Sequence, residues 1–205
     1  PELSRGLGDV YKRQIYNSSF INSDLRQVYH KSKLVAGVEN LPYKKILEPI
    51  LGNLLLDFGG TIGSRATQEN RAVFITKLNN KVAPIICYES MYGEYVTQYV
   101  RDGAQFLAIL TNDGWWNNSP GHKQLLSYSK IRAIETRRDI IRSANTGISA
   151  IINKKGDIVD SLDYNKKGFI NSSINLSDKI TFYVKYGDFI YRISLFFFLI
   201  IVLFY

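Results

Sequence analysis

Cysteine, histidine and methionine are scarce in this chain. Its 205 residues include one Cys, one Met and two His. A single cysteine excludes an intramolecular disulfide framework, and with only His30 and His122 to help, the spacing of a Cys/His zinc site is absent. The sequence therefore implies no metal and no cofactor. A lone thiol is most often a small buried hydrophobic group, so Cys87 needs support from its neighbours before it is given a chemical role.

The chain also lacks the usual signals of a nucleic-acid-binding protein. Its formal net charge is +8, but the lysines and arginines are spread along the sequence without a basic amphipathic arm or an RNA-binding aromatic motif. Its length suits one domain or a large piece of one. A membrane surface is the better interpretation of the basic charge, because the chain ends in an apolar run.

The two ends of the chain differ from its middle. The last eleven residues, 195–205, are uncharged and apolar, and a membrane-spanning helix needs roughly 20 such residues. We expect 187–205 to be a truncated transmembrane helix, with a buried core helix as the alternative. Residues 1–14 have no clear period and no signal-peptide architecture, and they resemble translated adapter sequence. Residues 15–186 are then a partial catalytic domain, and the chain is expected to be a fragment.

Between these ends, short apolar stretches alternate with turns. Strands followed by helices, and then a run of strands, predict a layered α/β fold. The run 106–110 is wholly apolar, as expected of a strand covered on both faces. The predicted strands lie within 28–38 and at 71–78, 81–86, 106–110, 140–143, 147–152, 158–159 and 168–176, and the predicted helices at 43–58, 93–100 and 122–138.

Cys87 stands at the end of an expected strand. The segment PIICYES places its thiol between an apolar run and a polar, turn-like stretch. In α/β proteins a side chain at such a strand end lies in a crevice at the sheet edge, where sites usually form. A helix that begins near 90–93 would also direct backbone N–H groups toward the sulfur and favour its thiolate. The position indicates a nucleophile, and a buried structural cysteine stays the alternative.

Two other segments carry residues that could act with this thiol. In YHKSKLVAGVE, Lys31 could stabilise a thiolate and later the oxyanion of a tetrahedral intermediate, although a solvated lysine on a loop is the simpler interpretation. In TNDGWW, the adjacent Trp115 and Trp116 could close over a pocket or contact lipid. Ordinary core packing beneath the loop is the alternative for these two rings.

Taken in order, five segments carry a family resemblance. YHKSKLVAGVE, PIICYES, TNDGWW, IRAIET and RSANTGISA resemble the catalytic domain of bacterial apolipoprotein N-acyltransferases, membrane-embedded members of the nitrilase (carbon–nitrogen hydrolase) superfamily. The resemblance covers 15–205, and the order of the five motifs makes it specific. It implies the second half of a nitrilase-like α-β-β-α sandwich, followed by the start of a C-terminal transmembrane helix.

The resemblance also implies roles for individual residues. The family uses a Glu-Lys-Cys triad, whose lysine falls on Lys31 and whose nucleophile falls on Cys87. Supporting glutamates fall on Glu39 and Glu89. The triad glutamate lies upstream of the lysine segment, so no residue of this chain is assigned that role.

The substrate pocket is also implied by the resemblance. The family's tryptophan loop, which shapes a lipid-facing pocket, falls on Trp115 and Trp116, and Tyr88 beside the nucleophile is placed in the same pocket.

The implied reaction moves an acyl chain from a phospholipid to the N-terminal amino group of a diacylglyceryl-cysteine in an apolipoprotein, through a thioester on Cys87. The implied partners are the phospholipid, the apolipoprotein and a membrane, and nucleic acid is not among them. The protein is expected to be a monomer at the bacterial inner membrane, with its catalytic domain facing the periplasm. Two alternatives stay open. One is a soluble nitrilase-type amidase acting on a small amide, and the other is a catalytically silent, membrane-attached domain that binds lipid.

Overall fold

The computed structural model describes residues 16–21, 27–36, 39–40, 66–116 and 119–204, and for Trp115 and Trp116 it describes the backbone alone. The segment 1–14 and the helix expected at 43–58 lie outside the described residues. The division of the chain at 14 and 186 therefore stays a prediction.

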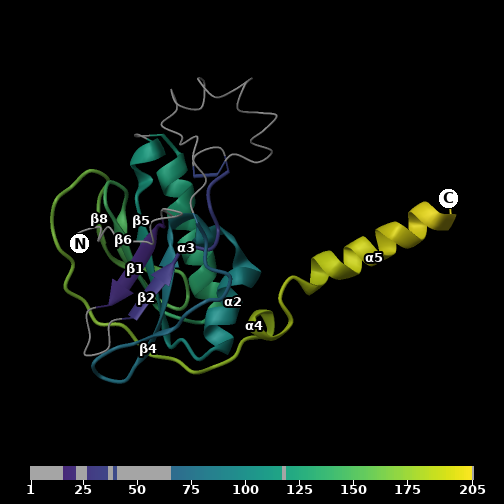
Figure 1. Cartoon of the computed structure of the whole chain (residues 1–205), viewed down its shortest axis with the longest axis horizontal. Helices are drawn as coiled ribbons and strands as arrows, with labels where there is room; N and C mark the ends of the chain where they lie inside the picture. Colours follow the sequence, from purple (N-terminus) through teal and green to yellow (C-terminus); the bar gives the residue numbers. More distant parts are fainter. Residues whose placement is uncertain (1–15, 22–26, 37–38, 41–65, 117–118, 205) are drawn as a thin grey trace, which may run out of the picture.

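A six-stranded sheet in the described part of the chain carries the fold, with the order β3-β4-β5-β6-β7-β8 (Figure 1). The central strands β4, β5 and β6 are parallel, and the three outer pairings are antiparallel. Parallel neighbours bring their carboxyl ends to one edge of the sheet, which is where the candidate site forms. The strands are β3 (Phe74–Ile75), β4 (Lys81–Ile86), β5 (Phe106–Thr111), β6 (Ile140–Ala144), β7 (Ser149–Ile152) and β8 (Ile158–Leu162).

Helix α2 (Gly93–Arg101) connects β4 to β5, and α3 (Gly121–Thr136) connects β5 to β6. Both helices lie on the same side of the sheet (Figure 1). The apolar face of α2 follows helical spacing, because Tyr95, Val96, Tyr99 and Val100 are all buried against the sheet. The predicted helix 93–100 is thus confirmed.

The buried face of α3 is partly polar, which explains its patchy apolar pattern in the sequence. The hydroxyl groups on this face are satisfied within the helix: Ser129 Oγ donates to the Leu125 carbonyl at 3.1 Å, and Thr136 Oγ1 donates to the Arg132 carbonyl at 2.7 Å. A buried hydroxyl that is hydrogen-bonded costs little free energy. The helix predicted at 122–138 is confirmed but ends two residues earlier, with Arg137 in the left-handed conformation at its C-cap.

A separate hairpin precedes the main sheet in the chain. Strands β1 (Ser18–Ile21) and β2 (Gln27–His30) pair antiparallel, with Ser18 opposite His30. Tyr29 on β2 is fully buried, and its ring packs edge-on against that of Tyr99 at 6.0 Å. This ring fixes the end of β2 against α2, so that Lys31, the next residue but one, begins a loop held close to the body of the domain.

Three sequence expectations need correction. Within 71–78 only Phe74–Ile75 forms a strand, since the following residues turn toward β4. The segment 168–176 is an extended, largely exposed coil and pairs with no strand of the described part. Asn175 at its end is instead bonded to Asp139 through its backbone N–H at 2.7 Å, which satisfies that N–H without a strand partner.

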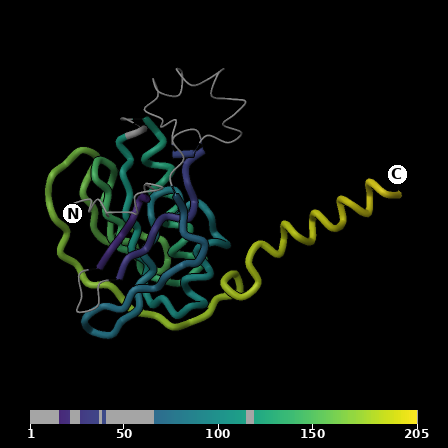
Figure 2. The backbone as a smooth tube through the Cα atoms, viewed as in Figure 1, coloured from purple at the N-terminus to yellow at the C-terminus, as the bar shows by residue number. Residues whose placement is uncertain are grey.

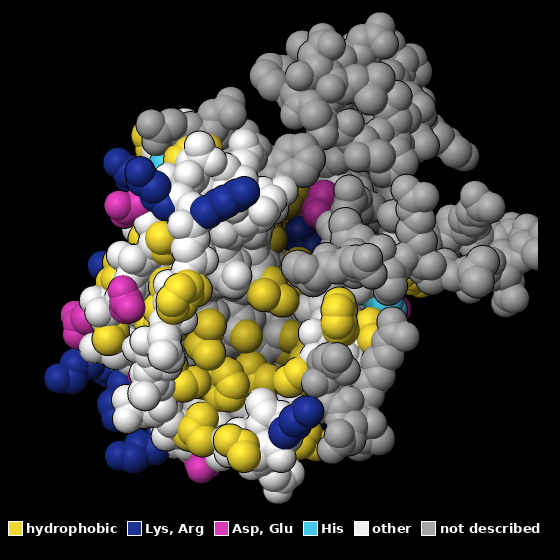
Figure 3. Space-filling view, turned by 90° about the vertical axis from the view of Figure 1, so that its left-hand side faces the viewer, with side chains coloured by type: hydrophobic (Ala, Val, Ile, Leu, Met, Phe, Trp, Pro, Cys, Tyr) yellow, Lys and Arg dark blue, Asp and Glu magenta, His cyan; other side chains and the backbone are white. Residues whose placement is uncertain are grey.

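The third correction concerns β5, which is covered fully on only one face. Leu107 and Ile109 point toward the helices and are buried, whereas Leu110 is 41% exposed. Ala108 shares the face of Leu110 and pairs with Ile141, which is also exposed. Figure 3 shows hydrophobic side chains gathered on the side of the molecule away from α2 and α3. The apolar run therefore predicted the strand correctly and its burial incorrectly.

The C-terminal part leaves the domain. Helix α4 (Phe182–Tyr186) packs on the body through the buried Val184, and α5 (Phe189–Phe204) then projects away from it (Figures 1 and 2). None of the described side chains of α5 is buried. Across the described residues we find no helix that combines the length and the apolar character needed to cross a membrane. The expected transmembrane helix at 187–205 is therefore unconfirmed.

Candidate active site

Cys87 lies directly after β4, at the carboxyl edge of the parallel strands, as the sequence predicted. It begins a short 3-10 helix, η1 (Cys87–Met91), and its φ angle is +50°. The other described non-glycine residues with positive φ are turn asparagines and the C-cap Arg137 of α3. For a cysteine this conformation costs about 1 kcal/mol or more, so the surrounding structure must hold it. The thiol is half-buried and free.

Glu89 is the residue that holds the turn. Its carboxylate is fully buried, and its Oε2 accepts the backbone N–H of Ile86 at 2.8 Å. Its Oε1 accepts the Tyr29 hydroxyl at 2.6 Å and the backbone N–H of Ser32 at 2.7 Å. One carboxylate therefore fastens the residue before Cys87 to the residue after Lys31. The two predicted catalytic segments lie side by side because of this group.

Burial also changes the titration of Glu89 and its neighbours. Desolvation raises the pKa of Glu89 above its ordinary value, and the hydrogen bonds that the carboxylate accepts oppose this shift. Burial, and then the charge of Glu89, raise the pKa of Tyr29, so its phenol remains a hydrogen-bond donor. The neutral Tyr29 hydroxyl can therefore keep donating to the buried Glu89 carboxylate, which holds the turn at Cys87.

Lys31 is buried in an ion pair within its own loop. Its Nζ donates to Glu39 Oε2 at 2.7 Å, and its side chain is 1% exposed. Glu39 Oε2 also accepts the backbone N–H of Val35 at 2.9 Å, and Oε1 accepts the amide of Asn17. These bonds orient the carboxylate, which in turn fixes the ammonium. Among the described residues Lys31 Nζ donates to no second acceptor.

The remaining predicted residues are placed less completely. Tyr88 is half-buried, and its ring packs edge-on against Tyr92 with the centroids 5.4 Å apart. Trp115 and Trp116 follow β5 in a second 3-10 helix, η2 (Asp113–Trp116), and their side chains lie outside the described residues. The roles of Cys87, Lys31 and the pocket residues therefore stay predictions. Within the described residues there is no cluster of metal-ligating side chains.

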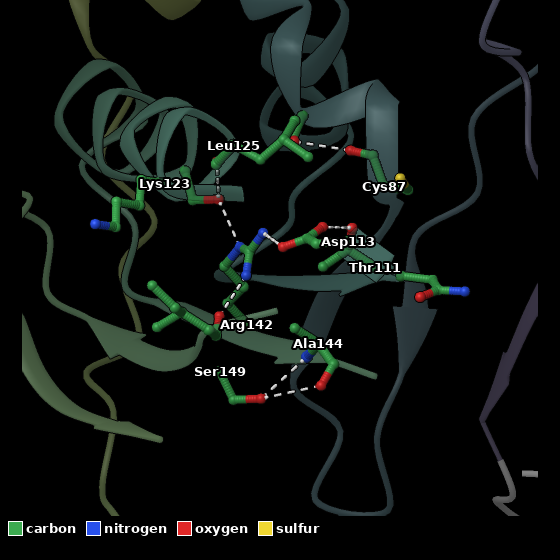
Figure 4. Close-up of polar contacts among 12 residues, drawn as sticks. Cys87, Thr111, Asp113, Lys123, Leu125, Arg142, Ala144 and Ser149 are labelled. Carbon is green, nitrogen blue, oxygen red and sulfur yellow. Dashed lines mark hydrogen bonds and ion pairs between the residues drawn. The ribbon is translucent and has the colours of Figure 1, made fainter. Parts of the chain in front are cut away.

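One buried pair at the same sheet edge was missed by the sequence reasoning. Arg142 on β6 donates through Nη2 to Asp113 Oδ2 at 2.7 Å, and both side chains are almost fully buried (Figure 4). Asp113 Oδ1 accepts the Thr111 hydroxyl at 2.7 Å, and Arg142 Nε donates to Ser129 Oγ at 3.2 Å. The guanidinium also donates to the carbonyl of Ile148. This network joins β5, β6, α3 and the loop that leads to the tryptophans.

Gly147 shows how tightly this network is packed. A Cβ atom at this position would lie 2.1 Å from Asp113 Oδ2, which no side chain can tolerate. Asp113 and Arg142 belong to the TNDGWW and RSANTGISA segments, whose motifs were recognised without a role for either residue. The available signal was an aspartate just after one strand and an arginine within the next strand.

Comparison with protein families decides the membership of this chain. A family model described as carbon-nitrogen hydrolase matches residues 4–181, which is most of the sequence. This chain belongs to the carbon–nitrogen hydrolase family. The match includes the lysine, cysteine and tryptophan segments, in agreement with the resemblance found in the sequence.

Curated relatives narrow the resemblance within the family. The chain is 32% identical over 172 residues to the apolipoprotein N-acyltransferase of Chlorobaculum tepidum, covering 82% of this chain and 32% of the relative. It is 34% identical over 193 residues to that of Bradyrhizobium diazoefficiens, covering 92% and 34%. The chain thus spans about a third of the length of these relatives.

Solved structures agree on the fold. Saccharomyces cerevisiae Nit3, a nitrilase-superfamily protein, matches with a TM-score of 0.53 at 17% identity, covering 76% of this chain and 52% of that protein. A carbon-nitrogen hydrolase from Helicobacter pylori G27 matches with a TM-score of 0.55 at 13% identity, covering 74% and 54%. The nitrilase-like α/β fold is therefore confirmed.

Proposed function

We propose that this chain is the catalytic part of an apolipoprotein N-acyltransferase. It carries an acyl chain from a phospholipid to the N-terminal amino group of a diacylglyceryl-cysteine, through a thioester on Cys87. The names of the curated relatives and the order of the five motifs support this reaction. The structural observation that carries it is the bridge made by Glu89, which ties the segment of Lys31 to the turn of Cys87.

The chemistry follows from the properties of these groups. The Cys87 thiolate attacks the ester carbonyl carbon of the lipid, and Lys31 stabilises the oxyanion that forms. The C–O bond of the ester breaks, the leaving lysophospholipid takes the proton that the upstream general base removed from the Cys87 thiol, and the acyl chain remains on sulfur. The amino group of the acceptor then attacks the thioester, loses a proton and regenerates the thiol. Covalent catalysis replaces one difficult step with two easier ones.

The ion pair of Lys31 suits this task. Glu39 holds the ammonium in one place, and the ammonium has further N–H groups to offer. A fixed donor in a buried site stabilises developing negative charge without having to reorganise during the reaction. Removal of such a donor usually costs about 10²–10³ in rate.

The test is thioester formation on a longer form of the protein in which the upstream residues of the relatives are restored. The purified protein is incubated in detergent with a phospholipid that carries a labelled acyl chain. We expect a label on Cys87 that neutral hydroxylamine removes. Cys87→Ala abolishes this label, and Lys31→Met lowers its rate of appearance by about 10²-fold or more. Labelling that persists in Cys87→Ala would contradict the assignment.

The chain alone provides a second test. The family's general base is a glutamate upstream of the lysine segment, and general bases typically contribute about 10²–10⁴-fold. No residue of 15–205 is assigned that role, so we expect little or no lipoprotein acylation by these residues alone in detergent. Robust turnover would overturn both the missing-base argument and the triad assignment.

The subcellular location of the protein is part of the same proposal. The exposed apolar side chains of α5 and its uncharged C-terminal half support attachment to a membrane. The family resemblance implies that this is the inner membrane, with the catalytic domain on the periplasmic side. A single cysteine suits that oxidising compartment because it has no internal partner for a disulfide. Membrane partitioning of the longer protein checks this placement and separates it from a soluble amidase.

A further inference from the structure

A charged cavity beside the start of α2 is not used by the proposed chemistry. It has a volume of about 410 Å³ and is bounded by α2, by the loop that follows β2 and by the junction of α4 and α5. Its charged lining residues are Lys33, Arg71, Arg101, Glu94 and Asp188. Cations exceed carboxylates in this lining, and their contacts decide which of them could hold a ligand.

Two of the cations lie near the same aromatic ring. The guanidinium carbon of Arg71 lies 4.0 Å from the centroid of Tyr95, and Lys33 Nζ lies 5.6 Å from the same centroid. The ring stabilises each cation but neutralises neither. Arg71 Nε is buried, and among the described residues it has no hydrogen-bond partner. No carboxylate in the described part of the chain forms an ion pair with Lys33 or Arg71.

The other charged groups of the cavity are already engaged. Glu94 is paired with Arg192 of α5, and Asp188 accepts the hydroxyl of Tyr183 at 2.7 Å. Arg101 donates to the carbonyl of Val184 at 2.6 Å. An added anion is therefore drawn to the end of the cavity that holds Lys33 and Arg71. Tyr92 and Gly93, at the N-terminus of α2, also line the cavity, and a helix N-terminus carries partial positive charge.

We propose that this cavity binds a phosphate group at the end lined by Lys33 and Arg71. A phosphate offers several acceptor oxygens in a tetrahedral arrangement, which suits both a planar guanidinium and a compact ammonium. Its charge would also relieve the repulsion between two cations held near one ring.

The position of the cavity indicates two sources for the phosphate. Tyr92 in its wall packs on Tyr88, the neighbour of Cys87, and Asp188 in its wall directly precedes the apolar helix α5. A phospholipid headgroup fits this position, because the acyl chains attached close to its phosphate could reach both Cys87 and the apolar helix α5. Free inorganic phosphate has the same binding chemistry. Assignment to the headgroup of the acyl donor rests on the proposed function, whereas phosphate binding itself does not.

Direct binding to the purified chain tests this site without any turnover. Calorimetric titrations at low salt use inorganic phosphate in one arm and sn-glycero-3-phosphoglycerol, a headgroup without acyl chains, in the other. We expect the Lys33→Gln/Arg71→Gln double variant to bind at least about tenfold more weakly whichever probe the wild-type chain binds, since two charge-assisted contacts are lost. Lys154→Gln/Lys155→Gln, on the exposed turn between β7 and β8, is the control with the same change in net charge.

Each outcome decides the proposal. Binding of sn-glycero-3-phosphoglycerol alone assigns the site to a lipid headgroup, and equal binding of both probes assigns it to phosphate in general. Failure of both probes to bind, or a cavity variant that binds as well as the control, overturns the site. Matching melting temperatures of the two double variants exclude a loss of folding as the cause. Thioester formation on Cys87 is measured separately, so failure of either proposal leaves the other standing.

Discussion

Two buried ion pairs lie near the carboxyl edge of the sheet, and they differ in what surrounds them. Lys31 and Glu39 are eight residues apart within one loop, whereas Asp113 and Arg142 are 29 residues apart and join two strands. Both pairs have a charge-to-charge distance of 2.7 Å and little exposure. The difference lies in the number of protein acceptors that hold each cation: three for Arg142 and, within the described residues, one for Lys31.

Each of the three nitrogens of Arg142 donates to a protein acceptor. They donate to Asp113, to Ser129 and to the Ile148 carbonyl, so the guanidinium links η2, α3 and the segment before β7. Lys31 Nζ has one acceptor in the described part of the chain. The Arg142 pair therefore links several elements of the fold, whereas the Lys31 pair holds an ammonium at a single contact and suits the proposed role of Lys31 in catalysis.

The largest expected effect comes from breaking the Asp113–Arg142 pair. Arg142→Ala leaves Asp113 buried without a counter-charge, and removal of one partner from such a pair costs about 3–5 kcal/mol of folding free energy. Urea denaturation followed by circular dichroism measures this loss. Arg137→Ala, which removes an exposed arginine, is the control and should change stability by less than about 0.5 kcal/mol. A small loss in Arg142→Ala would show that the network does not hold this edge.

An intermediate effect is expected at Glu89. Glu89→Gln puts an amide where the carboxylate accepts donors from several residues, and each donor left without an acceptor costs about 1–3 kcal/mol. Because burial raises the pKa of Glu89, the wild-type chain gains stability when this group is protonated and loses it as pH rises through the folded-state pKa.

The pH dependence sharpens this test. The stability difference between wild type and Glu89→Gln should be largest in acid and should shrink as pH rises through the folded-state pKa of Glu89. Denaturation midpoints of both proteins, measured from pH 4 to pH 8, report the difference. A difference that grows with pH would mean that the hydrogen bonds to the carboxylate outweigh its desolvation.

The smallest effect is expected at an exposed pair. Glu94 and Arg192 connect α2 to α5, but both side chains are about half exposed. Water and salt screen such a pair, so Glu94→Gln should cost about 0–1 kcal/mol in thermal or urea unfolding. A cost near that of Arg142→Ala would show that the exposed pair stabilises the fold as much as the buried one does.

Local patterns in the sequence predicted much of the fold. The strand 81–86 and the helix 93–100 follow from an unbroken apolar run and from the helical spacing of Tyr95, Val96, Tyr99 and Val100. The segment 168–176 was misassigned because its composition resembles a strand and only pairing partners make one. The exposed face of β5 was missed because an apolar run does not show which of its faces is covered.

The sequence by itself determined the alternation of strands and helices, the position of Cys87 at a strand end, and the five motifs that identify the family. Only the tertiary structure decided that Glu89 joins the lysine and cysteine segments and that Asp113 pairs with Arg142. It also decided that Lys33 and Arg71 both lie near the ring of Tyr95. The physical reason is distance along the chain. Periodicity and turn preference act between near neighbours, whereas a buried charge finds its partner only after the chain has folded around both.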